Sequence, residues 1–233
     1  DWSSDVCSSD LLMKRLAFDA VADFAHVSVT VANPRVFVGA PGLAAETIRD
    51  VLAQARAKPG SIRYGSSGVG TGPHLAGALL ASLARVDMTH VPYKGAAPAM
   101  TDVMAGQIEM VATTIMSSYQ MIQAGKMKAL AVTSAKRSAS LPNVPTVAES
   151  GVPGFEATAW SMLMAPRGTP RALVERLRAD TVRVLALPDV RRRLAAEGAD
   201  AIGSTPDEAT AHMRTEISRW SRVIREAGVQ GEQ

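Results

Sequence analysis

The strongest constraint on the fold is a regular alternation of short apolar stretches with helical stretches between residues 44 and 132. Residues 44–58 place Ile48, Leu52 and Ala55 on one helical face with charged residues opposite, which predicts an amphipathic helix. Further helices are expected at 73–85, 98–105 and 116–124, and strands at 61–65, 88–91, 108–112 and 129–132. Such alternation predicts an α/β fold with a mainly parallel sheet.

Different patterns flank this alternating region. Residues 24–38 predict two strands, or one bent strand, broken at Asn33 and Pro34. Residues 134–153 are rich in Ser, Pro, Asn and Gly, which predicts a long loop with one short helix at most. A strand is expected at 157–165, and three helices are expected to begin near Pro170, Pro188 and Pro206.

Composition narrows the possible functions. The 25 basic and 22 acidic residues are scattered along the chain, so the net charge of +3 does not predict nucleic-acid binding. No apolar run reaches the roughly 18 residues that a membrane-spanning helix needs. The single cysteine, Cys7, permits no internal disulfide. Residues 1–11 lack methionine, repeat Ser-Ser-Asp and do not resemble a signal peptide, so we predict that they are foreign linker or adapter sequence.

The most informative motif is a glycine-rich loop between an expected strand and an expected helix, with the sequence YGSSGVGTGPHLA at residues 64–76. Backbone N–H groups in such a loop, beside the positive end of a helix dipole, suit a carboxylate or phosphate. A tight turn without a ligand is about equally compatible with the glycines. The dinucleotide and phosphate-loop patterns are both absent, because Pro73 stands where a glycine is required and no Gly-Lys-Ser/Thr follows.

A serine nucleophile in this loop has little support. A hydrolase elbow around Ser67 would need glycines at positions 65 and 69, and position 69 is Val69. Metal catalysis is also disfavoured, because the four histidines lack metal-ligand spacing. Of these, His26 and His90 fall in expected strands and favour a structural role, whereas His74 falls in the first helical turn, where its ring can donate to the same anion.

A second motif, VPYKGAA at residues 91–97, follows another expected strand. Ligands of open α/β sheets bind at the carboxyl ends of the strands. Tyr93 can offer a hydroxyl group and Lys94 a positive charge, although a packed tyrosine beside a solvated lysine is equally compatible with these residues.

Five motifs in fixed order resemble one known family. They are YGSSGVGTGPHLAG, VPYKGAAPAMTDVMAGQIE, IQAGKMKALAVTSAKR, LPNVPTVAESGVPGFEATAW and APRGTP. Together they resemble the tripartite tricarboxylate transporter receptors, also called Bug or TctC-like receptors, from about residue 11 to residue 229. The resemblance implies a periplasmic binding protein of type II, with two α/β lobes joined by two crossing strands that close on a carboxylate.

The resemblance also implies a lobe division. Residues 39–164 would form the second lobe, and residues 12–38 with 165–233 would form the remainder of the first lobe. The crossings would lie near residues 36–39 and 162–166. The family's signal peptide and its first-lobe segment with another glycine-rich loop are not found in the sequence, so the first lobe is expected to be incomplete.

Site residues follow from the matching motifs. The family's ligand loop falls on Ser66, Ser67, Gly68, Gly70, Thr71 and His74, and its Tyr-Lys-Gly turn falls on Tyr93, Lys94 and Gly95. Many members carry Asp-Asn-Leu-Pro where this chain has Thr113 to Met116, which places Thr114 on the cleft wall and leaves the ligand's identity open. Trp160 is expected either to close one side of the pocket or to pack in the core.

The implied function is that of an extracytoplasmic receptor that binds a small organic carboxylate and delivers it to a membrane permease. Such a receptor catalyses no reaction, needs no cofactor or metal, works as a monomer in the periplasm and binds no nucleic acid. Two alternatives stay open at this point. One is a ligand-sensing receptor for a signalling partner, and the other is a serine hydrolase using Ser66 or Ser67.

Overall fold

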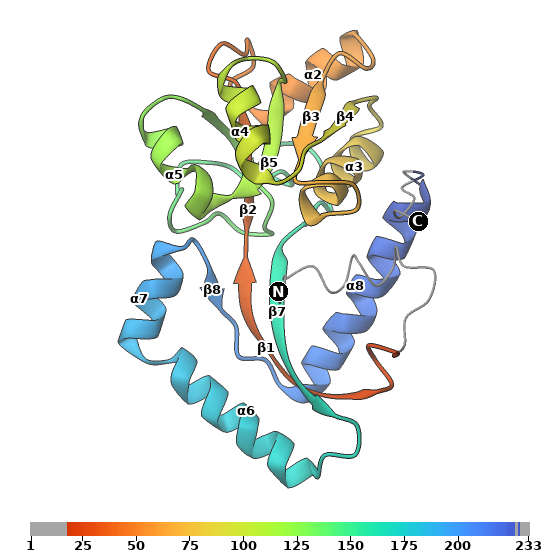
Figure 1. Cartoon of the computed structure of the whole chain (residues 1–233), viewed down its shortest axis with the longest axis vertical. Helices are drawn as coiled ribbons and strands as arrows, with labels where there is room; N and C mark the ends of the chain where they lie inside the picture. Colours follow the sequence, from red (N-terminus) through yellow and green to blue (C-terminus); the bar gives the residue numbers. More distant parts are fainter. Residues whose placement is uncertain (1–17, 227, 229–233) are drawn as a thin grey trace.

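The computed structural model describes residues 18–226 and 228, and these residues form two β-sheets with helices around each (Figure 1). One sheet has three strands in the order β7-β1-β8, and the other has five in the order β4-β3-β5-β2-β6. Residues 1–11 and Cys7, for which a foreign origin was predicted, lie outside the described residues.

The five-stranded sheet contains β2 (Arg35–Gly39), β3 (Arg63–Ser66), β4 (Thr89–Pro92), β5 (Met110–Thr114) and β6 (Lys128–Val132). Strand β3 is parallel to both β4 and β5, whereas β2 is antiparallel to both β5 and β6. Strands β3, β4, β5 and β6 therefore run in one direction and only β2 opposes them. The predicted mainly parallel α/β sheet is confirmed for this part of the chain.

Two pairs of helices cover this sheet on opposite faces. The pairs are α2 (Ile48–Ala57) with α3 (Gly72–Ala84), and α4 (Ala96–Met104) with α5 (Ile115–Gln123). Phe37 of β2 packs in the cluster that contains the buried residues of α2 and α3. Its neighbours Val36 and Val38 pack in the other cluster, with residues of α4 and α5. This alternation is the period of two that a strand imposes on its side chains.

Helix α2 begins later than the sequence pattern predicts. Thr47 accepts a hydrogen bond from the Asp50 backbone N–H, and the Asp50 carboxylate accepts one from the Thr47 backbone N–H. This reciprocal capping satisfies N–H groups that the first helical turn otherwise leaves unpaired. The helix therefore begins at Ile48 and not at residue 44.

The three-stranded sheet consists of β1 (Phe24–Asn33), β7 (Ala159–Pro166) and β8 (Asp200–Ala201), all antiparallel. Helices α6 (Arg171–Leu185), α7 (Pro188–Ala196) and α8 (Pro206–Glu226) follow β7 in the chain. Val27 of β1 packs with Val174 of α6. The adjacent His26 instead contacts α8, where its Nδ1 lies 2.9 Å from the Thr210 Oγ1. Helices α6 and α8 thus contact opposite faces of β1.

Helix α8 belongs to both halves of the molecule (Figure 1). Its first turns lie against β1, whereas Trp220 and Val223 pack in the cluster that contains α2 and α3. Near its end, the Ser82 hydroxyl of α3 donates to the Glu226 carboxylate at 3.1 Å. The helix therefore connects the two sheets in addition to the strand crossings.

Strand pairing changes sheet at places that differ from the expected crossings. Residues 36–39 lie entirely in the five-stranded sheet, and residues 162–166 lie in β7 of the three-stranded sheet. The change occurs at Pro34 because proline has no N–H to donate to a ladder, so pairing stops at Asn33 and restarts at Arg35. We therefore propose to divide the lobes at Pro34 and within residues 133–158, and not at 38/39 and 164/165.

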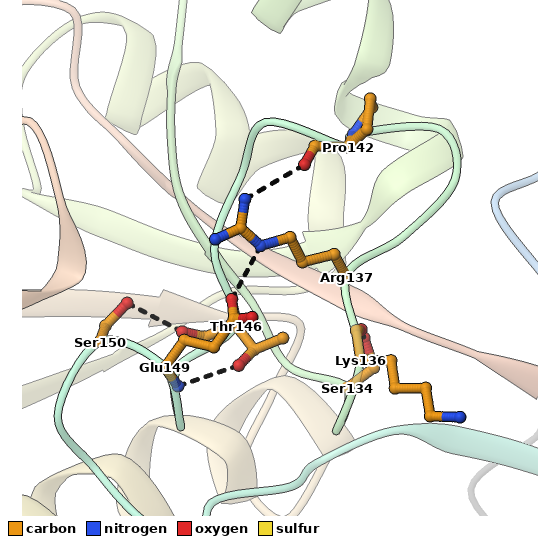
Figure 2. Close-up of polar contacts among 7 residues, drawn as sticks. All are labelled: Ser134, Lys136, Arg137, Pro142, Thr146, Glu149 and Ser150. Carbon is orange, nitrogen blue, oxygen red and sulfur yellow. Dashed lines mark hydrogen bonds and ion pairs between the residues drawn. The ribbon is translucent and has the colours of Figure 1, made fainter.

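The long loop after β6 forms several turns and no helix, where one short helix was thought possible; Figure 2 shows the turn at Thr146. The Thr146 backbone N–H donates to the Glu149 carboxylate at 2.9 Å, and the Glu149 N–H donates to the Thr146 hydroxyl at 3.0 Å. Arg137 donates to the same carboxylate at 2.9 Å. These bonds hold the loop together, and backbone bonds of Pro145 and Val147 with Val132 attach it to β6.

Among the described residues, no helix combines the length and the apolar character that crossing a lipid bilayer requires.

Candidate ligand-binding site

The carboxyl ends of the parallel strands meet at one edge of the five-stranded sheet. Ser66, Pro92, Thr114 and Val132 end their strands there, and the antiparallel β2 begins there with Arg35. Since β2 follows directly from β1, this edge faces the three-stranded sheet (Figure 1). The topology therefore gathers the predicted loop residues between the two halves of the molecule, where ligands of open α/β folds bind.

Short local hydrogen bonds hold the glycine-rich loop. The Thr71 hydroxyl donates to the Gly68 carbonyl at 2.8 Å, and the Gly70 N–H donates to Nδ1 of His74 at 2.9 Å. Gly68 and Gly70 have φ values of +144° and +76°, which residues with side chains rarely adopt. Glycine at these two positions is therefore required for the loop to reverse direction into helix α3.

The loop leaves several backbone donors available. The N–H groups of Ser67, Val69 and Gly72 have no hydrogen-bond partner within the described residues. Gly72 is the first residue of α3, and its N-cap Thr71 makes no side-chain cap. Because a helix N-terminus carries partial positive charge, these donors favour a small anion.

Ser66 is a structural residue of this loop. It is fully buried, and its hydroxyl donates to the Gly68 carbonyl at 2.9 Å while accepting from the Gly68 N–H at 3.2 Å. Nε2 of His90 lies 2.7 Å from the same oxygen, and the tautomer of the histidine decides which of the two atoms donates. Because the Ser66 hydroxyl is buried and bonded to both backbone groups of Gly68, this pair offers a substrate no accessible nucleophile.

Two histidines stack beneath the loop. The rings of His74 and His90 are nearly parallel, with centroids 3.7 Å apart, and the Tyr64 ring lies 5.1 Å from that of His90. Burial lowers the pKa of His90 to about 4, with a smaller contribution from His74. Burial also lowers the pKa of His74. Both rings are neutral at pH 7, which suits stacking and lets His74 accept the Gly70 N–H.

The Tyr-Lys-Gly turn lies directly beside the loop. The N–H of Tyr93 donates to the Ser66 carbonyl at 3.1 Å, and the N–H of Gly95 donates to the Ser67 carbonyl at 3.2 Å. The Tyr93 hydroxyl donates to the Asp102 carboxylate at 2.7 Å. Burial and this hydrogen bond raise the pKa of Tyr93 to about 12. Lys94 is exposed and forms no ion pair with a described residue, so its ammonium group lies in solvent beside the loop.

The two remaining predicted residues make no hydrogen bond with the glycine loop among the described residues. Thr114 is exposed at the end of β5, where it caps α5 by accepting from the Ser117 N–H at 3.2 Å. Trp160 belongs to β7 of the other sheet, and its indole N–H donates to the Glu216 carboxylate at 3.1 Å. Its described contacts place Trp160 in a second polar cluster and not against the glycine loop.

This second cluster lines a cavity of about 570 Å³ between β1, β7 and α8. Glu216 is 3% exposed and accepts from the indoles of Trp160 and Trp220 at 3.1 and 3.0 Å, and from Arg219 at 2.7 Å. His212 packs edge-on against Trp160. Most of the buried donors around Glu216 therefore donate hydrogen bonds to this one carboxylate.

Arg35, at the edge that carries the loop, was not among the predicted site residues. Arg35 is only 8% exposed, and a Cβ atom built on Gly72 would lie 2.3 Å from one of its guanidinium nitrogens. In sequence, Arg35 is one polar residue in an expected strand, and only the pairing of β2 with β5 places it at this edge. Pro34 was the available signal, because it marks the start of the strand.

The described residues contain no group of three or more His, Cys, Asp or Glu side chains that is able to hold a metal ion.

Comparison with known proteins identifies the relatives of this chain. The family model described as tripartite tricarboxylate transporter family receptor matches residues 3–229. A protein encoded in the tcbD-tcbE intergenic region of Pseudomonas sp. strain P51 is 39% identical over 211 residues, which cover 90% of this chain and 63% of that protein. BugT of Bordetella pertussis is 32% identical, with 93% and 67% covered. The chain thus spans about two thirds of the length of these relatives.

Solved structures agree with the family and the fold. Rpa4515 of R. palustris, solved with adipate, superposes with a TM-score of 0.80 at 32% identity and covers 97% of this chain and 75% of its own. MatC from Rhodopseudomonas palustris, solved with bound malate, has a TM-score of 0.75 at 29% identity, with 95% and 76% covered. The chain therefore belongs to the tripartite tricarboxylate transporter receptor family and has its type II periplasmic binding fold.

Proposed function

We propose that this protein is a periplasmic receptor that binds a small organic carboxylate and delivers it to the permease of a tripartite tricarboxylate-type transporter. The receptor works as a monomer and catalyses no reaction. The observation that supports this proposal best is the glycine loop at the edge between the two sheets, whose N–H groups at Ser67, Val69 and Gly72 are available to an anion.

The loop provides the chemistry that a carboxylate needs. Two carboxylate oxygens accept several hydrogen bonds, and backbone donors at a helix N-terminus replace the water that the anion loses on entering the site. Lys94 adds an exposed positive charge on the neighbouring turn. Adipate and malate, which two similar proteins were solved with, are both small dicarboxylates, and ligands of this class are the first to test.

Closure of the two lobes would complete the site. The lobes are joined by the β1 to β2 crossing at Pro34, by the segment before β7 and by helix α8, and bending at these connections brings the three-stranded sheet toward the glycine loop. A receptor that closes in this way presents a distinct ligand-bound surface, which the permease recognises.

The test is a thermal-shift screen of the protein expressed from its gene against C4 to C6 dicarboxylates, acidic amino acids and aromatic acids, with calorimetry of each positive compound. A ligand present at 100 times its Kd stabilises the native state by about 2.7 kcal/mol. Ser67→Leu, which places a bulky side chain beside the free donors, is expected to abolish the shift. Ser218→Leu, on the exposed face of α8, is the matched control and keeps it.

A 1:1 complex with one of these acids, lost in Ser67→Leu and retained in Ser218→Leu, supports the receptor proposal. Absence of binding by any acid, together with turnover of an ester or amide, contradicts it and revives the hydrolase alternative.

A further inference from the structure

Arg35 occupies a fixed position at the start of β2. Its N–H donates to the Thr133 hydroxyl at 2.9 Å, and its carbonyl accepts from the Thr133 N–H at 2.8 Å and from the Thr133 hydroxyl at 3.1 Å. On the other side it is paired in register with Thr114 of β5. The backbone of this arginine is therefore held by both neighbouring strands, at the edge that carries the glycine loop.

Its side chain reaches across the sheet to helix α3. A Cβ atom on Gly72 would lie 2.3 Å and 3.0 Å from the two terminal guanidinium nitrogens and 2.7 Å from Cζ. No side chain can therefore stand at position 72 while Arg35 keeps this position. The glycine that begins α3 thus makes room for a buried cation at the helix N-terminus.

Two sources of positive potential meet at this point. One is the first turn of α3, with the Gly72 N–H available, and the other is the guanidinium of Arg35. Both favour negative charge at the same place, because the helix dipole and the arginine have the same sign there. The planar fork of a guanidinium also matches the two oxygens of a carboxylate.

We propose that Arg35 is a specificity-determining residue of the binding site, where it selects a charged carboxylate over a neutral group of the same shape. This inference rests on the proposed function and adds a residue to its site. The backbone donors of the loop bind any oxygen acceptor, charged or neutral. Arg35 adds a formal charge, and its contribution is therefore largest for an ionised ligand.

The experiment compares Arg35→Gln with the wild-type protein, using adipate, succinate and malate and the neutral diamide of each, by calorimetry and competition. Loss of a hydrogen bond to a charged group weakens binding by about 10- to 150-fold. We expect this loss for the acids and little change for the diamides. Arg56→Gln is the matched control, because Arg56 contacts the Ala84 carbonyl at the opposite end of α3.

A second variant keeps the test decisive if Arg35→Gln fails to fold. Gly72→Ala keeps the arginine in the sequence but displaces its guanidinium. We expect it to weaken binding of the acids to a similar degree. Three results would overturn the role of Arg35. The first is equal weakening of acid and diamide binding, the second is wild-type affinity for the acids in both variants, and the third is a loss of affinity in Arg56→Gln as large as that in Arg35→Gln. If the wild-type protein binds none of the acids in the wider screen, the proposed function itself has failed.

Discussion

The glycine loop and the Glu216 cluster satisfy their polar groups in opposite ways. In the loop, neutral groups that are near one another in the sequence form hydrogen bonds, as Gly70 does with His74 and Thr71 with Gly68. Around Glu216, one buried carboxylate binds donors from two elements, including Trp160, which is 56 residues away. The first region depends on local geometry and the second on a single charge.

The two regions also differ in what they leave unpaired. The loop leaves backbone N–H groups at a partly exposed edge, where water or a ligand can reach them. The cavity beside Glu216 instead contains three buried side-chain atoms without a partner in the described structure, namely Thr158 Oγ1, His212 Nε2 and Arg219 Nε. Unpaired donors at an accessible edge are suited to binding, whereas buried ones cost stability until another group satisfies them.

Of the variants in these two regions, Glu216→Leu is expected to cause the largest loss of stability. The substitution leaves two indole N–H groups and the Arg219 guanidinium buried without their acceptor. Removing one partner of such a buried pair costs about 3 to 5 kcal/mol, measurable as the free energy of unfolding in urea. Arg214→Leu, at an exposed position of the same helix, controls for the new leucine. A loss below 1 kcal/mol for Glu216→Leu would show that the cluster does not stabilise this lobe.

A smaller loss is expected from Ser66→Ala in the glycine loop. This variant leaves the Gly68 N–H and Nε2 of His90 without their shared hydrogen-bond partner, which costs about 1 to 3 kcal/mol. Ser67→Ala is the matched variant one residue along, where no hydroxyl hydrogen bond is lost among the described residues. We expect it to unfold like the wild type. Equal destabilisation by both variants would contradict the structural role assigned to Ser66.

The smallest effect on stability at neutral pH is expected from His90→Gln, whose amide can still form a hydrogen bond with Ser66. The folded pKa of His90 lies near 4, below the 6.5 of an unfolded histidine, so the unfolded chain binds the proton first. The stabilising contribution is complete above pH 6.5 and is lost as the pH falls toward 4. The wild type should therefore lose more stability than His90→Gln between pH 7 and pH 5 in thermal melts. If the wild type and His90→Gln lose the same stability over this pH range, the group that titrates is not His90.

Much of the fold follows from local patterns in the sequence. The period of the apolar residues predicted the helices and strands of the alternating region, and Pro188 marked the start of α7 as observed. The motifs at residues 64–76 and 91–97 were predicted to lie at strand ends, and the structure joins them through the Tyr93 and Gly95 N–H groups. Parallel strands bring consecutive strand ends to one edge, so these neighbours could be predicted without coordinates.

Other features depended on contacts between distant segments. Asn33 and Pro34 indicated a break, but the pairing of β1 with β7 and of β2 with β5 decided that the two strands belong to different sheets. Trp160 carried two equally plausible roles until the structure placed it on Glu216. Arg35 and Gly72 are 37 positions apart in the sequence, and neither residue by itself predicts that the guanidinium packs where Gly72 lacks a side chain.

The sequence by itself thus determined the order of the elements and the loop conformation that glycine permits, and it predicted an anion site, because these depend on neighbours within a few residues. The tertiary structure alone decided where the sheet changes, which buried carboxylate collects the indole donors, and which arginine reaches the loop. Those outcomes depend on strand register and on side-chain packing across the fold, and a single residue's identity does not encode its distant partner.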